Sequence, residues 1–204
     1  MKKLFLPFLI MLIFSEPLSA KYRSHTLLSF HLGFARATQR SPRLSSGIGL
    51  NFDMPLTRSM HFNLMPTFSF RGYSGSTTVK ARYLDLPFNI EFSGNKNKTT
   101  GFFGVGGYIG LAIKGKYKDT YYTDWKKMNF GESTADNRSN LDGGLLFNMG
   151  MMAPVDKGIM KFGLQYIVGL KNVVPKDRQL TAADEIKLRN FTCYLAVSIF
   201  NKRK

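Results

Sequence analysis

The sequence predicts an all-β fold, a transmembrane antiparallel up-and-down β-barrel of about eight strands. Three observations lead to this prediction. Apolar and polar residues alternate with a period of two in several segments, the links between these segments alternate in length, and a secretory signal opens the chain. The 19 glycines and the 14% share of aromatic residues also favour strands over long helices.

Residues 1–20 have the layout of a secretory signal. Two lysines follow the first methionine, an apolar stretch runs from Leu4 to Phe14, and Ser19-Ala20 supplies small residues at the cleavage point. The alternative, an N-terminal membrane anchor, needs roughly 18 or more apolar residues, and this stretch is shorter. We therefore expect cleavage after Ala20 and a single barrel domain over residues 21–204.

The segment from Arg82 to Phe92 shows the clearest alternation. One set of alternate positions is apolar: Leu84, Leu86, Phe88, Ile90 and Phe92. The opposite set carries polar and charged groups: Tyr83, Asp85, Asn89 and Glu91. Successive side chains of a strand point to opposite faces, so this strand has one apolar face and one face that tolerates charge.

Seven further segments bring the predicted number of strands to eight. Phe102 to Ile113, Met160 to Leu170 and Phe191 to Ile199 alternate clearly; Thr26 to Ala35, Ser46 to Met54, Met60 to Phe70 and Asp142 to Met152 alternate more weakly. An even number suits a single-chain bacterial barrel. Pro66 and Pro87 each remove a donor from the ladder, so we expect bulges or irregular pairing beside them.

The predicted links are alternately short and long. The short links lie around 55–58, 94–98 and 154–158, and the longer polar links cover 36–44, 71–78, 114–140 and 171–188. Outer-membrane barrels have short periplasmic turns and longer external loops, so both chain ends are expected on the periplasmic side.

The composition of the polar face separates a membrane barrel from a soluble one. A soluble exported barrel packs large apolar residues inside, whereas here the polar face is rich in Gly, Ser and Asn. Isolated charges share it, and they predict a polar network in the lumen formed by Asp53, Asp85, Glu91, Asp142 and Lys161, with Arg71 and Lys114 as further candidates. Charges in so narrow a lumen must pair or stay hydrated, and no solute pore is expected.

Two motifs carry a family resemblance. Tyr83-Leu84-Asp85-Leu86-Pro87-Phe88, followed by Gly106-Gly107-Tyr108-Ile109-Gly110, resembles the PorT-type outer-membrane β-barrel family. The opening Asp142-Gly143-Gly144 and the segment from Tyr166 to Leu170 fit the same pattern. The resemblance implies an eight-stranded barrel in the outer membrane, and some members are similar to components of a type IX secretion and gliding apparatus.

The formal charge of the chain is +16, and the basic residues collect in the predicted external links and strand tops. They are Arg36, Arg40, Arg43, Arg71, Lys80, Arg82, Lys116, Lys118, Lys126, Lys127, Lys176 and Arg178. A basic rim of this kind suits the phosphates of lipopolysaccharide, and a solvated loop surface is the alternative. Nucleic acid is not an expected partner of an exported membrane barrel.

The longest predicted link mixes aromatic residues with lysines. Aromatic side chains favour the headgroup level of a membrane because the ring is apolar and its polar end stays wet. We expect a lipid or partner contact that involves Tyr121, Tyr122, Trp125, Lys126 and Lys127.

No catalytic or cofactor motif accompanies the three histidines, His25, His31 and His61. The only cysteine, Cys193, rules out an intramolecular disulfide, and no metal or cofactor is expected. Two function classes follow. The first is a non-enzymatic structural or interaction component of the envelope, with a PorT-like type IX secretion or gliding apparatus as one setting. The alternative is a lipid-acting outer-membrane enzyme that performs acyl transfer or hydrolysis on lipopolysaccharide.

Overall fold

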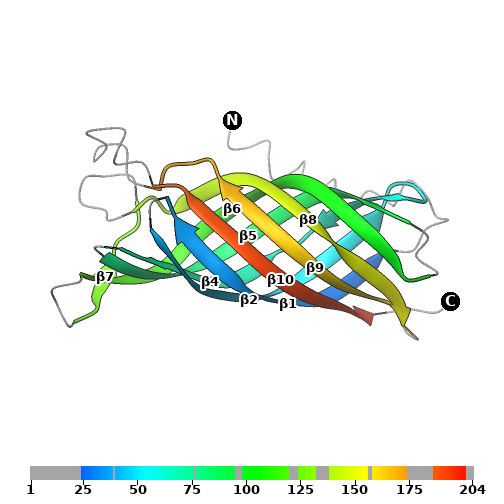
Figure 1. Ribbon diagram of the computed structural model, residues 1–204, viewed down its shortest axis with the longest axis horizontal. Helices are drawn as coiled ribbons and strands as arrows, with labels where there is room; N and C mark the ends of the chain where they lie inside the picture. The colour runs from blue at the N-terminus through cyan, green and yellow to red at the C-terminus, as the bar shows by residue number, and fades with distance from the viewer. Residues whose placement is uncertain are drawn as a thin grey trace.

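The strands of the computed structural model close into one antiparallel barrel (Figure 1). The structure describes residues 24–38, 40–75, 77–94, 98–119, 124–131, 138–155, 158–173 and 186–200, so the predicted signal peptide lies outside it. The strands are β1 (His25–Ala37), β2 (Ser41–Pro55), β3 (Met60–Leu64), β4 (Thr67–Ser74), β5 (Thr77–Ser93), β6 (Thr100–Asp119), β7 (Lys126–Met128), β8 (Leu141–Val155), β9 (Gly158–Gly169) and β10 (Leu188–Phe200). The first and last barrel strands, β1 and β10, pair side by side, and β5 pairs with β6, so the ladder returns to its start. The predicted fold class is confirmed.

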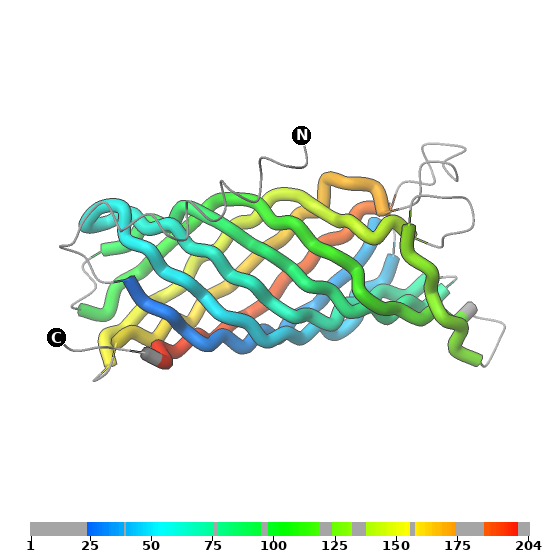
Figure 2. Tube along the Cα trace, turned by 180° about the vertical axis from the view of Figure 1, so that it is seen from behind, coloured from blue at the N-terminus to red at the C-terminus, as the bar shows by residue number. Residues whose placement is uncertain are grey.

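Two of these elements, β3 and β4, share one position around the barrel. Both pair with β2 and β5, and the register against β5 is unchanged across the break, since Leu64 lies opposite Phe88 and Thr67 opposite Asp85. The short strand β7 pairs with β6 in the described chain and extends the barrel wall at the end opposite the described chain ends. Eight strand positions therefore surround the lumen, and Figure 2 shows them crossing it obliquely.

The two prolines produce a single interruption. Pro66 lies at the break between β3 and β4, as expected. Pro87 stays in register with Tyr108 of β6, but on its other side the pairing of β5 stops at Phe88 and resumes at Asp85, so the irregular pairing expected beside Pro87 is found on that side alone. The N–H and C=O of a residue in an antiparallel ladder point to the same side, and the Pro87 carbonyl accepts from Met65 N at 2.8 Å. The backbone N–H that any other residue would have at position 87 would point into the same break between β3 and β4. There the Thr67 hydroxyl donates to the Met65 carbonyl at 2.9 Å.

Because of a bulge in β6, one residue that was predicted in the interior faces outward. Arg82 of β5 lies opposite Lys114 of β6, but the next residue, Tyr83, lies opposite Ala112. Ile113 therefore has no partner on β5 and forms the bulge. Ala112 points inward, whereas Ile113 and Lys114 are both exposed. An extra residue in a strand reverses the facing of everything that follows it. The prediction of Lys114 on the interior face is therefore wrong.

Two of the predicted long links are short. Strands β1 and β2 are separated by residues 38–40 and β4 and β5 by residues 75–76, so the links expected over 36–44 and 71–78 are largely strand. The link expected over 114–140 likewise begins as strand, since β6 continues to Asp119 and pairs with β7. The strands continue beyond the apolar belt, where backbone hydrogen bonds form whatever the polarity of the side chains. A pattern of apolar and polar residues therefore does not reveal these parts of the strands. Strands β2 and β3, β5 and β6, and β8 and β9 reach their short links at the end of the barrel that holds both described chain ends (Figure 1).

The barrel is inverted relative to a soluble protein. Leu84 is 49% exposed while its neighbour Asp85 is 2% exposed, and the same contrast recurs around the wall. Large apolar side chains form an outward belt that includes Phe34, Leu44, Phe103, Phe147, Phe162 and Phe191. So large a continuous apolar surface requires an apolar surrounding. Within the described residues, no helix is long and apolar enough to cross a membrane.

The outward belt makes a testable prediction about stability in lipid. Phe147 is 45% exposed near the middle of β8, so Phe147→Arg should destabilise the barrel by about 2–4 kcal/mol in a bilayer. Leu56, which is 46% exposed in a short turn, is the matched control, and Leu56→Arg should cost only about 0–1 kcal/mol. Urea unfolding of barrels refolded in lipid vesicles measures both. Equal costs at the two positions would contradict the belt.

Candidate functional site in the barrel interior

The interior holds three apolar clusters and two groups of charged side chains. An apolar cluster near the chain ends contains Leu27, Phe102, Met152, Ile159, Tyr194 and Ala196. A central one contains Met65, Tyr108, Leu146 and Ile167. The third, at the opposite end, contains Ala37, Tyr73, Val79, Ala81, Tyr83, Ala112, Met128, Val173, Ile186 and Leu188. The charged groups lie against these clusters, since Lys161 Nζ lies 5.3 Å from the centroid of the Phe102 ring and Arg71 Cζ lies 5.7 Å from that of Tyr108.

One charged group, called the lower group, lies nearer the chain ends and is centred on Lys161 of β9, which is fully buried. Its Nζ lies 2.5 Å from Glu91 Oε1 and 3.1 Å from Asp53 Oδ2. On the far side of the aspartate, His61 Nδ1 lies 3.1 Å from Asp53 Oδ1. One ammonium is thus shared by two carboxylates, which belong to β2 and β5. Desolvated charges persist in a protein only when they are paired and hydrogen-bonded in this way.

Two asparagines connect the lower group on β5 to β8, across the intervening strand β6. Asn89 Nδ2 donates to Asn148 Oδ1 at 2.8 Å, and Asn148 Nδ2 donates to Glu91 Oε2 at 3.5 Å. Gly104 lies beneath this bridge, where a Cβ atom would come within 2.7 Å of Asn89 Nδ2. Real Cβ atoms are essentially never so close to a neighbour, so the bridge requires a glycine at this point of β6.

The other charged group, called the upper group, lies farther from the chain ends and is centred on Arg71 of β4. Its Nη2 lies 2.6 Å from Asp85 Oδ2, and its Nη1 lies 3.7 Å from Asp142 Oδ2. Ser69 Oγ donates to the same Asp85 oxygen at 2.5 Å, and the Tyr108 hydroxyl donates to Asp142 Oδ2 at 2.7 Å. Arg71 is 6% exposed, so its assignment to the external rim is wrong, and its alternative assignment to the interior face matches the structure.

Aromatic rings enclose the guanidinium of Arg71. Its Cζ lies 5.2 Å from the centroid of the Tyr83 ring and 5.7 Å from that of Tyr108. A cation over an aromatic face is stabilised by the quadrupole of the ring, more strongly where water is excluded. The motif tyrosines Tyr83 and Tyr108 thus hold the interior arginine in place.

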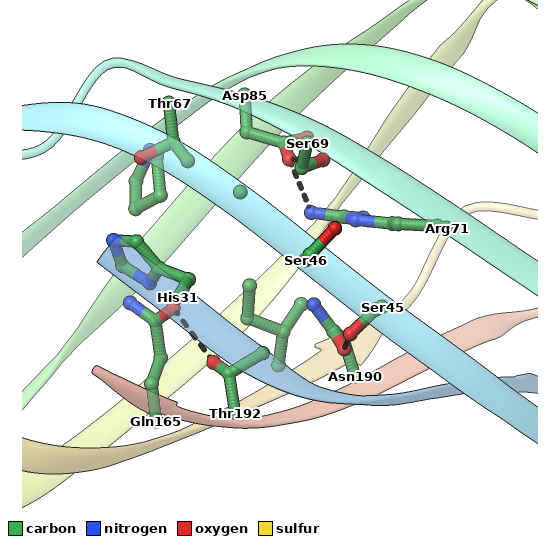
Figure 3. Close-up of a pocket in the computed structure, with 13 residues that line it drawn as sticks. His31, Ser45, Ser46, Thr67, Ser69, Arg71, Asp85, Gln165, Asn190 and Thr192 are labelled. Atoms are coloured by element: carbon green, nitrogen blue, oxygen red, sulfur yellow. Dashed lines mark hydrogen bonds and ion pairs between the residues drawn. The ribbon is translucent and has the colours of Figure 1, made fainter. Parts of the chain in front are cut away.

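A small polar cavity adjoins the upper group (Figure 3). It measures about 20 Å³, which is room for about one water molecule. Side chains of several strands face it, with Ser45 Oγ donating to Asn190 Oδ1 at 2.9 Å and Thr192 Oγ1 donating to Gln165 Oε1 at 3.4 Å. The cavity is too small for a solute.

The five predicted interior charges divide between the two groups. Asp53, Glu91 and Lys161 meet in the lower group, and Asp85 and Asp142 meet at Arg71 in the upper one. All five are at most 2% exposed. Sequence reasoning missed the place of His61 beside Asp53, although His61 and Asn63 alternate with Phe62 and Leu64, and this alternation puts the histidine on the inward face.

The interior offers little to a catalyst of lipid chemistry. His31 Nε2 lies 3.1 Å from Ser29 Oγ, but both side chains are buried in the lumen, where a lipid outside the wall has no access. The ring of His31 stacks on that of Tyr194, with 5.5 Å between centroids. In the part of the chain that the structure describes, no three His, Cys, Asp or Glu side chains are grouped to hold a metal.

Part of the predicted external contact can be placed. Trp125 is 38% exposed, and the ammonium groups of Lys80 and Lys116 lie 4.9 Å and 5.0 Å from the centroid of its ring. Lys126 and Lys127 belong to the exposed part of β7. Tyr121 and Tyr122 lie outside the described residues, as do Lys176 and Arg178 of the predicted rim.

Comparison with known proteins supports the fold. No family model matches the chain, and no curated protein sequence matches it. Among solved structures, Neisserial surface protein A is 10% identical, with a TM-score of 0.50 over 87% of this chain and 100% of that one. Ail, the attachment invasion locus protein of Yersinia pestis, is 11% identical, with a TM-score of 0.47 over 85% and 95%. The outer-membrane enzyme PagL is 11% identical, with a TM-score of 0.45 over 84% and 99%. The first of these shows that the chain has the fold of the small outer-membrane barrels.

The lower charged group predicts a large effect of removing its cation. Lys161→Met leaves Glu91 and Asp53 buried without their shared ammonium, so it should destabilise the barrel by about 3–5 kcal/mol. Lys98→Met, at an exposed lysine of a short turn, is the matched control and should change stability by less than about 0.5 kcal/mol. Urea unfolding in vesicles measures both, and adding Glu91→Gln to Lys161→Met should recover part of the loss. Indistinguishable effects of the two lysine variants would show that the buried ion pairs contribute nothing.

Proposed function

We propose that this chain is an outer-membrane barrel of a Gram-negative envelope that acts as a structural or interaction component and has neither enzymatic activity nor a solute pore. The observation that carries the proposal is the interior of the described barrel, which two buried charged groups and three apolar clusters occupy. Because these side chains fill the lumen in the described part of the chain, the surfaces left for an interaction are the outer wall and the external end. The predicted signal peptide and the outward apolar belt support export to the outer membrane.

The external end supports an interaction role. It carries the long links, the strand β7 and exposed basic and aromatic side chains, among them Trp125, Lys126 and Lys127. Such a surface suits the phosphates of lipopolysaccharide or an envelope protein. A place in a PorT-like type IX secretion or gliding apparatus rests on the resemblance of the Tyr83–Phe88 and Gly106–Gly110 motifs. No observation on the described residues favours the lipid-acting enzyme, since the Ser29–His31 pair faces the lumen.

Electrical recording tests the closed interior. The purified barrel should give no discrete conductance steps in planar lipid bilayers, because the charged groups and apolar clusters leave no continuous water path. Insertion is verified by heat-modifiable migration on a denaturing gel, and a porin added to the same bilayer shows that the recording detects pores. Reproducible steps from the barrel alone would refute the proposal.

Site-specific crosslinking tests the interaction role. A photo-crosslinking amino acid placed at Lys126, on the exposed strand β7, should capture envelope proteins in intact cells. The same group at Phe147, in the outward belt, is the matched control and should capture lipid without protein. Mass spectrometry identifies the adducts and tests the secretion setting directly. The absence of protein adducts at Lys126 would contradict a protein-binding role.

A further inference from the structure

Five basic side chains gather on the outer wall above the apolar belt, around a cleft of about 540 Å³. The outward residues that line it include Arg43 and Leu44 of β2, Phe70 of β4, Lys80 and Arg82 of β5, and Lys114 and Lys116 of β6. Gly72 of β4 also lines it. We call this feature the basic cleft.

The register places like charges directly opposite each other in the basic cleft. Lys80 pairs with Lys116 and Arg82 with Lys114 across the β5–β6 ladder. The bulge at Ile113 creates both pairs, because it turns Lys114 and Lys116 outward beside Arg82 and Lys80. Like charges directly opposite each other destabilise a sheet. A barrel that keeps two such pairs on one face is complementary to an anion.

In the described ranges, no carboxylate neutralises the five cations of the basic cleft, because none lies within ion-pair distance of them. Their recorded contacts are with neutral groups instead. Arg43 Nη1 donates to Ser74 Oγ at 2.8 Å, Arg82 lies 5.6 Å from the Phe70 ring, and Lys80 and Lys116 both lie against Trp125.

The depth of the basic cleft matches the headgroups of the outer leaflet. It lies toward the end with the long links, which is the external end in barrels of this type. The next outward pair along β5 and β6 toward the opposite end is Leu84 with Leu111, which are 49% and 43% exposed in the apolar belt. Leu44, 65% exposed, and Phe70, 43% exposed, continue this apolar surface into the cleft itself. An occupant therefore meets cations and apolar side chains together.

We propose that the basic cleft binds the phosphomonoester headgroup of a lipid in the outer leaflet, with the acyl chains of the lipid along Leu44 and Phe70. A phosphomonoester carries about −1.5 to −2 charges at pH 7 and three acceptor oxygens, so a single group can bridge the opposed cation pairs. Arginine and lysine form charge-assisted hydrogen bonds with such oxygens. This inference rests on the proposed placement in the outer membrane, and it gives that proposal a defined lipid site.

The only tryptophan of the chain, Trp125, lies between Lys80 and Lys116 and so reports on the basic cleft. Phosphatidic acid is titrated into the barrel in phosphatidylcholine nanodiscs while tryptophan fluorescence is recorded. We expect a saturable change with phosphatidic acid, and no change when phosphatidylcholine or inorganic phosphate is added instead. A full response to inorganic phosphate alone would overturn the lipid assignment, and a response to phosphatidylcholine, a zwitterionic phosphodiester, would overturn the role of the phosphomonoester.

Two variants locate the site. R82Q combined with K114Q removes one opposed pair without touching Trp125, and should weaken phosphatidic acid binding by about tenfold or more. K98Q, at an exposed lysine near the other end of the barrel, should leave binding unchanged. In phosphatidylcholine alone the double variant should be at least as stable as the wild type, because a like-charge pair is gone. Unchanged binding in the double variant would overturn the proposal.

The result is separable from that of the proposed function. Insertion and the absence of conductance depend on the belt and the filled lumen, and the cleft variants alter neither. If the barrel inserts and stays closed but does not bind phosphatidic acid, only the lipid site is wrong. If it fails to insert or conducts ions, the proposed function is wrong.

Discussion

The closed backbone ladder is the constraint on which the rest of this structure depends. A bilayer core offers no water to unpaired N–H and C=O groups, so a sheet can cross it only when its first and last strands pair. Here β1 pairs with β10, and the interruption at Met65-Pro66 is bridged by bonds that involve the carbonyl of Pro87 and the hydroxyl of Thr67. Closure then fixes the facing of every residue, since alternate side chains point to lipid or to lumen.

The lumen is the consequence of that alternation. Eight strands enclose a space that side chains nearly fill, so any charge placed inside loses most of its water. Among the described residues, the buried lysine Lys161 and the buried arginine Arg71 each lie between two carboxylates. The apolar clusters packed against these groups exclude the water that would compete for them. Chains of packed polar groups of this kind tie distant strands together and hold the barrel closed.

The chemical character of the outward side chains changes with depth along the barrel. In the belt, the outward side chains are large and apolar, whereas just above it the wall carries five cations that no carboxylate of the described residues pairs with. A single extra residue, Ile113, produces part of this change by turning Lys114 away from the lumen. One bulge thereby removes a charge from a crowded interior and adds it to a surface where an anionic headgroup is available.

The sequence alone predicted the closed barrel and the facing of most strands, because alternation is a local property of the chain. Leu84 and Asp85 face as their alternation indicates. It did not predict that Lys114 faces outward, since a bulge depends on pairing between strands. The partners of Lys161 were equally hidden, because Asp53, Glu91 and Lys161 come from strands distant in sequence and meet only when the barrel closes. The short links after β1 and β4 were missed because their residues are polar yet hydrogen-bonded as strand.

The central claim is that alternate residues of each strand face lipid and lumen. A spin-label scan along β5 in lipid vesicles tests it most directly, with the accessibility of each label to oxygen in the bilayer as the readout. The account predicts high oxygen accessibility at Leu84, Phe88 and Ile90 and low accessibility at Asp85 and Asn89. Uniform accessibility along β5, or the opposite alternation, would contradict it.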